Sequence, residues 1–222
     1  MVRDAHSTAH SVDPSQGDGP TAPAERILAA ALACMERDGI EATGIRSIAR
    51  EAGVNSAAIN YYFRSKDNLI RLALERSLEN AFGGTLTELD RLIAEGAPVR
   101  AAFERVMDDY IRNVRGFPRL AYAHLREALV NQRYDGDAVK SLNAFLDGLL
   151  QRLAPDASAE RAHELRLLLV QAWGNLLLMA VLPQLFDPFL KLDFSDDEQR
   201  ARYAGRLLAP IEAWFAEGAA GE

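Results

Sequence analysis

The stretch from Ser56 to Arg64 combines small, amide, aromatic and basic side chains at the spacing of a short helix. The apolar residues of this helix share one side, which we expect to face inward: Ala58, Ile59, Tyr62 and Phe63. The opposite side carries the small, polar and basic residues: Ser56, Ala57, Asn60, Tyr61 and Arg64. A slim face of this kind fits a DNA major groove, about 12 Å wide, and reaches base edges.

Several side chains on or near this face have the chemistry for distinct DNA contacts. The side-chain amide of Asn60 is able to donate one hydrogen bond to adenine and accept another from it, and such a pair of bonds recognises the base. Tyr61 and Lys66 suit phosphate oxygens, and Arg46 lies on the preceding helix, which is expected to cross the phosphate backbone. The alternative is that these outward polar groups are simply solvated.

The residues before this face have the pattern of the first helix of a helix-turn-helix. Its apolar positions share one side: Ile45, Ile48, Ala49 and Ala52. Ala49 is small enough for two helices to cross closely, and Gly53 supplies the tight turn. Val54 then returns the chain to the core. The same geometry also occurs in helical bundles that bind no DNA, which leaves a helical scaffold or adaptor as an alternative.

The segment AERILAAALACMERDGIEATGIRSIAREAGVNSAAINYYFRSKDNLI resembles the N-terminal domain of the TetR (tetracycline repressor) family of transcriptional regulators. The matching features are Gly39, Thr43, Arg46 through Val54, Asn60 through Phe63, and Ser65 through Leu69. The resemblance implies a three-helix DNA-binding domain followed by a larger helical domain that binds a ligand and dimerises. It also implies a repressor that holds a pseudo-palindromic operator as a dimer and is released by a small-molecule inducer.

From the outward face and the resemblance together we predict a set of DNA-contact residues: Thr43, Arg46, Asn55, Ser56, Ala57, Asn60, Tyr61 and Lys66. Three positions depart from the family pattern. Asn60 replaces a frequent tyrosine, and Ala57 replaces a glycine that approaches DNA closely. Gly44 stands where the family often has a second threonine. The operator sequence therefore does not follow from the resemblance.

The charge of the chain is unevenly distributed. The whole sequence of 222 residues carries a net charge of −7, but residues 43–71 hold five basic and two acidic side chains, a net of +3. The remainder is strongly acidic, with a net charge of −10. A locally basic patch neutralises phosphates, while the acidic body is discouraged from lying on DNA.

The periodicity predicts an all-α protein with a small N-terminal unit joined to a larger bundle. We expect a disordered tail at 1–20, a helix-turn-helix domain at 21–66 and a ligand-binding and dimerisation domain at 67–222. Helices are predicted at 23–38, 45–52, 56–63, from 66 onward with Gly83-Gly84 bending or ending it, and at 98–115, 118–132, 136–153, 158–185 and 196–216. Ser195 and Glu198 have the spacing of a capping box for the last helix.

The helix at 158–185 is apolar nearly all round, so both of its sides must be covered. The last helix also carries an apolar stripe from Ala204 to Phe215. Two such helices from each of two chains would form a four-helix interface, as the resemblance also implies, so we predict a homodimer through the last two helices. The alternative is that these helices complete a monomeric core.

A ligand pocket is predicted in the same region. Gln171 and Asn175 are four residues apart and point the same way on an apolar helix, and further polar or aromatic side chains lie nearby: Tyr110, Tyr122, His124 and Trp173. Apolar walls with a few polar groups are typical of small-molecule sites. The alternative is that both amides are satisfied by hydrogen bonds inside the core or across the dimer. The sequence names no ligand.

The sequence contains few residues arranged for catalysis or metal binding. The single cysteine, Cys34, excludes an intramolecular disulfide and a zinc site built on paired cysteines. Two histidines, His6 and His10, fall in the expected tail, and His124 and His163 lie on different helices without ligand spacing. No glycine-rich phosphate loop or nucleophile elbow is present. We therefore predict no enzyme activity, no cofactor and no metal.

The chain is expected to be cytoplasmic, with no membrane partner. The first twenty residues have no continuous apolar core of the kind found in a secretory signal. The most apolar stretch, residues 165–182, includes Arg166, Gln171 and Asn175. These polar side chains favour a buried helix over a membrane span.

Overall fold

The computed structural model describes residues 22–113 and 115–220, and over these ranges the secondary structure is helical with no strand. The predicted all-α class is confirmed. The expected tail at 1–20 lies outside the described residues. The helices are α1 (Ala22–Asp38), α2 (Ile45–Ala52), α3 (Ser56–Phe63), α4 (Lys66–Leu78), η1 (Glu79–Gly83), α5 (Gly84–Ala94), α6 (Val99–Asn113), α7 (Pro118–Asn131), α8 (Asp137–Leu153), α9 (Ala159–Val181), α10 (Asp187–Leu190) and α11 (Asp197–Ala220).

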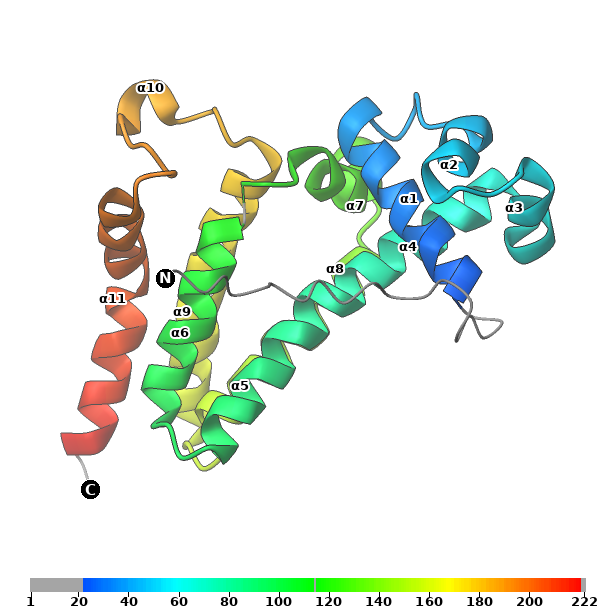
Figure 1. Ribbon diagram of the computed structural model, residues 1–222. Coiled ribbons are helices and arrows are strands. Elements are labelled where there is room, and N and C mark those ends of the chain that lie inside the picture. Colours follow the sequence, from blue (N-terminus) through cyan, green and yellow to red (C-terminus); the bar gives the residue numbers. More distant parts are fainter. Residues whose placement is uncertain (1–21, 114, 221–222) are drawn as a thin grey trace, which may run out of the picture.

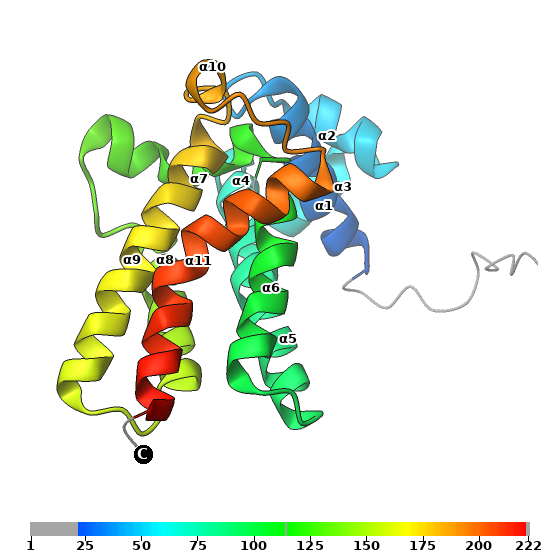
Figure 2. The same cartoon turned by 90° about the vertical axis from the view of Figure 1, so that its left-hand side faces the viewer.

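The helices form two lobes joined by one long diagonal (Figure 1). The smaller lobe contains α1, α2 and α3, and the larger one contains α6, α9 and α11. The continuous run of α4, η1 and α5 passes from the small lobe to the far end of the large one, and α7 lies between the lobes. In the view turned by 90°, α9 and α11 form the face toward the viewer, and α11 crosses in front of α6 (Figure 2).

The diagonal bends without ending. The sequence left open whether Gly83-Gly84 would end or bend the helix, and the structure places a π-helical turn, η1, directly before α5. A π turn inserts an extra residue into the helical repeat and changes the helix direction while keeping backbone hydrogen bonds. The small lobe is therefore attached to the large one through an unbroken strut.

The small lobe has its own apolar core, made by α1, α2, α3 and the first turns of α4. Ile27, Ile48, Ile59 and Leu69 are completely buried in it. Gly53 adopts a φ of +67° between α2 and α3, where a side chain would be strained. The predicted helix-turn-helix geometry is thus built by a positive-φ glycine and a shared core. The expected domain boundary at 66 remains a prediction. The small lobe's core also includes residues of α4 after that position: Leu69, Ile70 and Ala73.

Helix α7 is fastened to α1 across the two lobes. The Glu36 carboxylate accepts hydrogen bonds from the backbone N–H groups of Arg119 at 3.4 Å and Leu120 at 2.9 Å. These are the first free N–H groups of α7, where a negative charge is favoured by the helix dipole. Leu120 itself is buried in the small lobe's core, and Arg119 donates to the backbone carbonyl of Arg37. α7 therefore belongs structurally to both lobes.

The large lobe packs around a second apolar core, in which Phe145 stacks on Phe82 with ring centroids 4.6 Å apart. α9 and α11 are locked together by a reciprocal contact. The Trp214 indole N–H donates to the Arg161 carbonyl at 3.2 Å, and the Arg161 guanidinium lies 4.4 Å from the centroid of the Trp214 ring. The apolar stripe of the last helix faces this core, with Ala204, Leu208, Ile211 and Trp214 buried.

The connection between α9 and α11 differs from expectation. α9 ends at Val181, and the four-residue α10 follows. Arg115 holds this segment, because its guanidinium bonds the Asp187 carboxylate at 2.8 Å and lies 4.5 Å from the Phe194 ring centroid. A contact between residues so distant in sequence leaves no local signal.

The capping box predicted from Ser195 is wrong by one position. The side chain of Asp196 caps α11 by accepting the Gln199 N–H at 3.0 Å. Ser195 is engaged instead with the carboxylate of Asp193, to which its hydroxyl donates at 2.7 Å. The competing local hydrogen bond moves the start of the helix to Asp197.

Candidate nucleic-acid interface and ligand cavity

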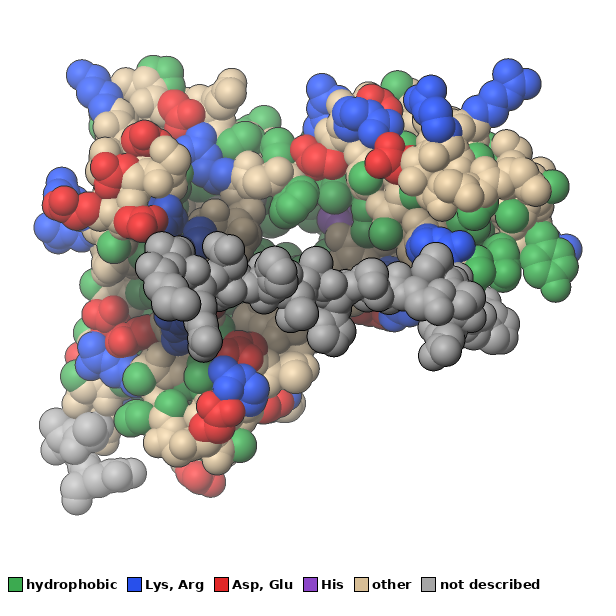
Figure 3. Space-filling view, in the orientation of Figure 1, with side chains coloured by type: hydrophobic (Ala, Val, Ile, Leu, Met, Phe, Trp, Pro, Cys, Tyr) green, Lys and Arg blue, Asp and Glu red, His purple; other side chains and the backbone are tan. Residues whose placement is uncertain are grey.

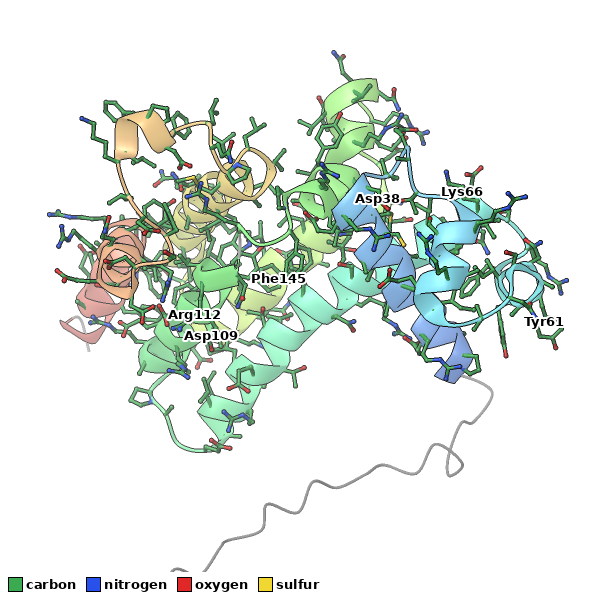
Figure 4. The ribbon with its side chains drawn as sticks, turned by 45° about the horizontal axis from the view of Figure 1, so that its top comes forward. Asp38, Tyr61, Lys66, Asp109, Arg112 and Phe145 are labelled. Carbon is green, nitrogen blue, oxygen red and sulfur yellow. The ribbon has the colours of Figure 1, made fainter. Side chains whose placement is uncertain are left out.

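The outer side of α3 is exposed, as the sequence analysis expects. Ile59 and Phe63 are buried against the small lobe's core. The opposite side presents exposed residues to solvent: Asn55, Ala57, Asn60, Tyr61 and Arg64. Ser56 is half-buried at the start of the helix. Figure 4 shows Tyr61 at the outer end of the small lobe, directed away from the protein, with Lys66 on the same lobe.

Side-chain hydrogen bonds fix both ends of α3. The side-chain carbonyl oxygen of Asn55 accepts a hydrogen bond from the Ala58 N–H at 2.8 Å and caps the helix. Beyond the other end, Ser65 caps α4 by accepting from the Asn68 N–H at 3.2 Å, as predicted, and the Asn68 amide donates back to the Phe63 carbonyl at 3.0 Å. These bonds hold α3 as a rigid rod, and they occupy the Asn55 oxygen while leaving its amide hydrogens free.

Tyr62 only partly follows its predicted inward orientation. Its side chain is 37% exposed, and its ring contacts that of Tyr61 edge-on with centroids 5.2 Å apart. Tyr62 lies in the last turn of α3 and is not among the residues packed against the small lobe's core. Together the two tyrosines form an aromatic edge beside the polar face.

Thr43 does not share the exposed face with the other predicted contact residues. Its side chain is completely buried, and its hydroxyl donates to the Gly39 carbonyl at 2.8 Å, which closes the turn after α1. The start of α2 is secured by Ser47, whose hydroxyl accepts from the Gly44 N–H at 3.2 Å and donates to the Gly44 carbonyl at 2.7 Å. In this structure Thr43 stabilises the turn and has no hydroxyl left for a phosphate.

The basic side chains around α2 and α3 are largely free. Arg46, Arg50 and Arg64 are exposed and Lys66 is half-exposed, and none has an ion-pair partner within the described ranges. Farther from α3, Arg71 is paired with Glu75 at 2.8 Å. Figure 3 shows Lys and Arg side chains along the upper edge of the small lobe. Unpaired cations on one lobe of an acidic chain provide a local site for phosphates.

A cavity of about 820 Å³ lies where the two lobes meet, and a hollow is visible between them in Figure 3. Its lining residues come from α1, the α4–η1–α5 diagonal and helices α6 to α9. Of the residues predicted for a ligand pocket, Tyr110, His124 and Trp173 line this cavity. They come from three different helices, so only the tertiary fold brings them together.

The other three predicted pocket residues lie elsewhere. Tyr122 is 42% exposed on α7, on a different side from His124. Gln171 and Asn175 share one side of α9, as their spacing indicates, but that side is exposed to solvent. Asn175 accepts a hydrogen bond from the Tyr203 hydroxyl of α11, which agrees with the alternative of a structural amide.

The sequence analysis missed much of the cavity wall. Leu32 and Glu36 come from α1, Phe82 from η1, Phe117 from the start of α7 and Leu142 from α8. Most of these residues have ordinary helical apolar spacing, which gives no sign of whether a side faces a filled core or a cavity. The position of Phe82 next to Gly83-Gly84 is the one local hint, because a disturbed helix often marks a functional site.

Burial perturbs the titratable groups of the cavity. Desolvation lowers the pKa of His124 to about 4, so the imidazole is neutral near pH 7. His124 forms no hydrogen bond with any residue in the described part of the chain. Burial also raises the pKa of the Tyr110 phenol, which keeps its proton. The cavity interior therefore offers neutral polar groups.

Among the described residues, no group of three His, Cys, Asp or Glu side chains is arranged to hold a metal ion. Cys34 is buried in the small lobe's core, where its sulfur accepts from the Arg37 guanidinium at 3.3 Å. His6 and His10 lie outside the described residues, and His163 is exposed on α9.

Comparison with known proteins agrees with this geometry. Residues 27–73 match the family model described as bacterial regulatory proteins, tetR family. The N-terminal part of the chain is therefore similar to the tetR family. The match spans α1, α2, α3 and the start of α4, which is the unit that carries the exposed helix face.

Two curated relatives match the chain over its N-terminal part. The nicotine-responsive transcriptional repressor HdnoR of Paenarthrobacter nicotinovorans is 32% identical over 84 residues, 38% of this chain and 41% of the relative. The transcriptional dual regulator CecR of Shigella flexneri is 38% identical over 94 residues, 40% of this chain and 41% of the relative. The matched part of the chain thus spans about two-fifths of each relative's length.

A solved structure extends the likeness to the whole fold. A transcriptional regulator from Rhodococcus sp. Rha1 superposes with a TM-score of 0.58 at 24% identity, covering 85% of this chain and 97% of that protein. The helical C-terminal lobe thus has the same overall fold as that protein.

We predict that His124→Gln makes the stability of the protein less sensitive to acid. Because the folded protein has the lower His124 pKa, the unfolded chain binds more protons between about pH 6.5 and pH 4, and stability falls as the pH drops through this window. The replacement should remove up to about 3 kcal/mol of that loss. Urea unfolding at pH 7 and pH 4.5 measures the difference, with His163→Gln on the exposed side of α9 as control. Equal acid sensitivity of wild type and His124→Gln would contradict the prediction.

Proposed function

We propose that this protein is a ligand-responsive, DNA-binding transcriptional regulator that holds a pseudo-palindromic operator as a dimer. The observation that carries the proposal is the exposed polar side of α3, flanked by basic side chains without ion-pair partners. Arg46, Asn55, Ser56, Ala57, Asn60, Tyr61 and Lys66 form the proposed contact set. Repression by exclusion of polymerase is the expected mode, and one matched relative is named as a repressor.

The proposed dimer uses α9 and α11, whose outer sides lie on the face shown in Figure 2. α9 exposes Leu167, Val170 and Leu178, with the exposed Gly174 among them. α11 exposes small residues four apart: Gly205, Ala209 and Ala213. Small residues let helices approach closely, and two copies would complete a four-helix interface. Such a dimer provides two recognition helices for half-sites roughly 34–36 Å apart.

α9 is also long and apolar enough to cross a membrane by length and composition alone. One side of it, however, packs in the core through Leu165, Leu169 and Leu176. The exposed side includes Gln171 and Asn175, whose polar groups would be costly in lipid. A second copy is a better partner for this side than a bilayer, and we place the protein in the cytoplasm.

A small molecule in the cavity would act on DNA binding through α1 and α7. Both helices contribute to the cavity wall, and α1 packs on the helix-turn-helix. A ligand that shifts α7 would move α1 and change the separation of the two recognition helices. Near-complete release requires the ligand to prefer the released form by up to roughly 10⁴-fold. The nicotine-responsive relative is named for a response of this kind.

The rival proposals are an enzyme and a helical adaptor. A gel shift with the DNA upstream of the protein's own gene separates them from a regulator. A regulator retards that DNA at low ionic strength and loses the complex on addition of unlabelled specific duplex. Failure to bind any duplex at low ionic strength would reject the proposal, because the free basic groups would then have no phosphate partner.

We predict that Lys66→Ala weakens binding to all DNA sequences about equally and lowers the slope of log affinity against log salt by about one. The physical reason is the loss of one phosphate contact and the counterions that it releases. Fluorescence anisotropy over a series of salt concentrations measures the slope. Lys140→Ala, which removes an exposed lysine of α8, is the matched control. An unchanged slope would reject the phosphate contact.

Asn60→Ala should relax sequence preference while retaining most non-specific binding. The exposed amide has the groups to pair with adenine, and its loss costs about 1–3 kcal/mol of discrimination at one base pair. Selection from random duplexes by the wild type and the variant reveals the affected position. If both proteins select the same sequence with equal strength, Asn60 does not read a base.

Val170→Glu should disrupt the dimer and weaken operator binding. Val170 is 59% exposed on the outer side of α9, and a carboxylate there would be desolvated in the proposed interface. Light scattering after size-exclusion chromatography measures the mass. Val130→Glu makes the same change at a position of α7 that is 56% exposed. A Val170→Glu protein that remains a dimer would refute this interface.

A further inference from the structure

The charged groups of the cavity wall are all acidic: Glu36, Glu88 and Asp109. The described residues that line the cavity include no Lys or Arg. An anionic ligand would therefore be desolvated next to carboxylates without a counter-charge, which is strongly unfavourable. The wall thus selects against carboxylates, phosphates and sulfates.

These carboxylates are also not free to receive a cation. Glu36 accepts the first N–H groups of α7, with the nearer at 2.9 Å. Glu88 accepts hydrogen bonds from the Arg91 guanidinium at 2.6 and 2.7 Å, and Asp109 lies 3.7 Å from that of Arg105. A cationic ligand would have to compete with a helix N-terminus or an arginine for each of them. The cavity therefore favours an uncharged ligand.

Two polar groups of the wall lie next to each other, Tyr110 on α6 and Trp173 on α9, with ring centroids 5.7 Å apart. Trp173 is only 3% exposed, and its indole N–H has no hydrogen-bond partner among the described residues. Leaving such a donor unsatisfied costs about 1–3 kcal/mol. Native proteins keep few groups of this kind, so each one calls for an explanation.

The Trp173 N–H lies beside the Tyr110 hydroxyl and opposes part of the rise that burial causes in the Tyr110 pKa. The two rings are in contact, with centroids 5.7 Å apart, but the N–H and the hydroxyl fall short of hydrogen-bond geometry. The Tyr110 O–H has no acceptor of its own among the described residues. The pair is thus placed to act as a donor relay: the indole N–H would donate to the phenol oxygen, and the phenol hydrogen remains available to an acceptor.

The rest of the wall is mainly apolar, with Phe82, Val106 and Phe117 among its members, and the neutral His124 faces the same space. The remaining polar lining residues are uncharged: Ser77, Asn80, Thr85 and Asn113. A volume of about 820 Å³ accommodates a drug-sized molecule. Burial of apolar surface would supply most of the binding energy, and the few polar groups would set the orientation.

We propose that the cavity binds an uncharged, mainly apolar molecule with one hydrogen-bond acceptor, such as a ketone, ester or ether oxygen, which accepts from the Tyr110 hydroxyl while Trp173 supports that hydroxyl from behind. This inference rests on the proposed function in taking the cavity as the ligand site. It adds the charge of the ligand and the group that the protein recognises.

Four probes built on one scaffold test the ligand class by isothermal titration calorimetry. Benzophenone is neutral with a ketone acceptor, and diphenylmethane has the same two rings without the acceptor. 4-Benzoylbenzoate adds a negative charge, and (4-benzoylbenzyl)trimethylammonium adds a positive one. We expect benzophenone to bind about tenfold more tightly than each of the other three, since tenfold corresponds to about 1.4 kcal/mol, the size of one net hydrogen bond.

Tyr110→Phe is the decisive variant, because it removes the hydroxyl and keeps the ring. The advantage of benzophenone over diphenylmethane should fall below about twofold. Tyr122→Phe removes the same atom from an exposed tyrosine of α7 outside the cavity and should retain the tenfold ratio. A ketone preference that survives Tyr110→Phe overturns the inference, as does a charged probe that binds as tightly as benzophenone, or failure of all four probes to bind.

A measurement on the wild-type protein covers the case in which Tyr110→Phe fails to fold. The sequence contains two tryptophans, so its ¹H–¹⁵N spectrum shows two indole N–H signals, which Trp214→Phe assigns. Benzophenone should shift the Trp173 signal more than diphenylmethane does, because an acceptor on Tyr110 strengthens the relay. Equal shifts overturn the inference.

The two proposals fail separately. A protein that binds benzophenone with the expected preference but ignores every duplex refutes the regulator and keeps the ligand class. A protein that retards DNA but binds none of the four probes refutes the ligand class and keeps the regulator.

Discussion

The attachment of α7 to α1 is the contact on which the arrangement of the two lobes depends. The chain passes between the lobes through α4, but a single helical strut would leave the small lobe free to swing. Glu36 removes that freedom by placing its carboxylate on the first N–H groups of α7, and Leu120 adds an apolar anchor in the small lobe's core. Because the next turn of α7 brings His124 to the cavity, one helix joins the cavity wall to the small lobe.

The bounds of α2 and α3 were predictable to the residue, because nearby residues in the sequence determine where these helices begin and end. Gly53 takes a positive φ that other residues rarely adopt, and Asn55 caps α3 with its own side chain. The start of α11 shows the limit of this approach. Ser195 and Glu198 have the spacing of a capping box, yet Asp193 offers the Ser195 hydroxyl a nearer acceptor, and Asp196 takes over the cap. A spacing rule does not rank competing acceptors within the same turn.

The cavity was less predictable, because periodicity gives the relative direction of two side chains and not the absolute one. Gln171 and Asn175 do point the same way, but toward solvent, where Asn175 meets Tyr203. Trp173, between them in sequence, faces the cavity. Thr43 illustrates the same limit in the small lobe, since its hydroxyl is buried against Gly39 instead of exposed beside α3. Which side of an apolar helix meets core, cavity or partner is decided by helices distant in sequence.

α9 has two sides with different environments, and this gives the cavity its place in the proposed mechanism. Trp173 closes the cavity from one side, and Val170 is exposed on the side where a second copy would pack. α7 likewise contacts two regions, because it lines the cavity and packs against the small lobe's core. A molecule in the cavity would therefore contact the helix proposed to form the dimer and the helix that holds the small lobe. In the proposed dimer the distance between the two α3 helices would depend on these two attachments, so a molecule in the cavity would change it without touching DNA.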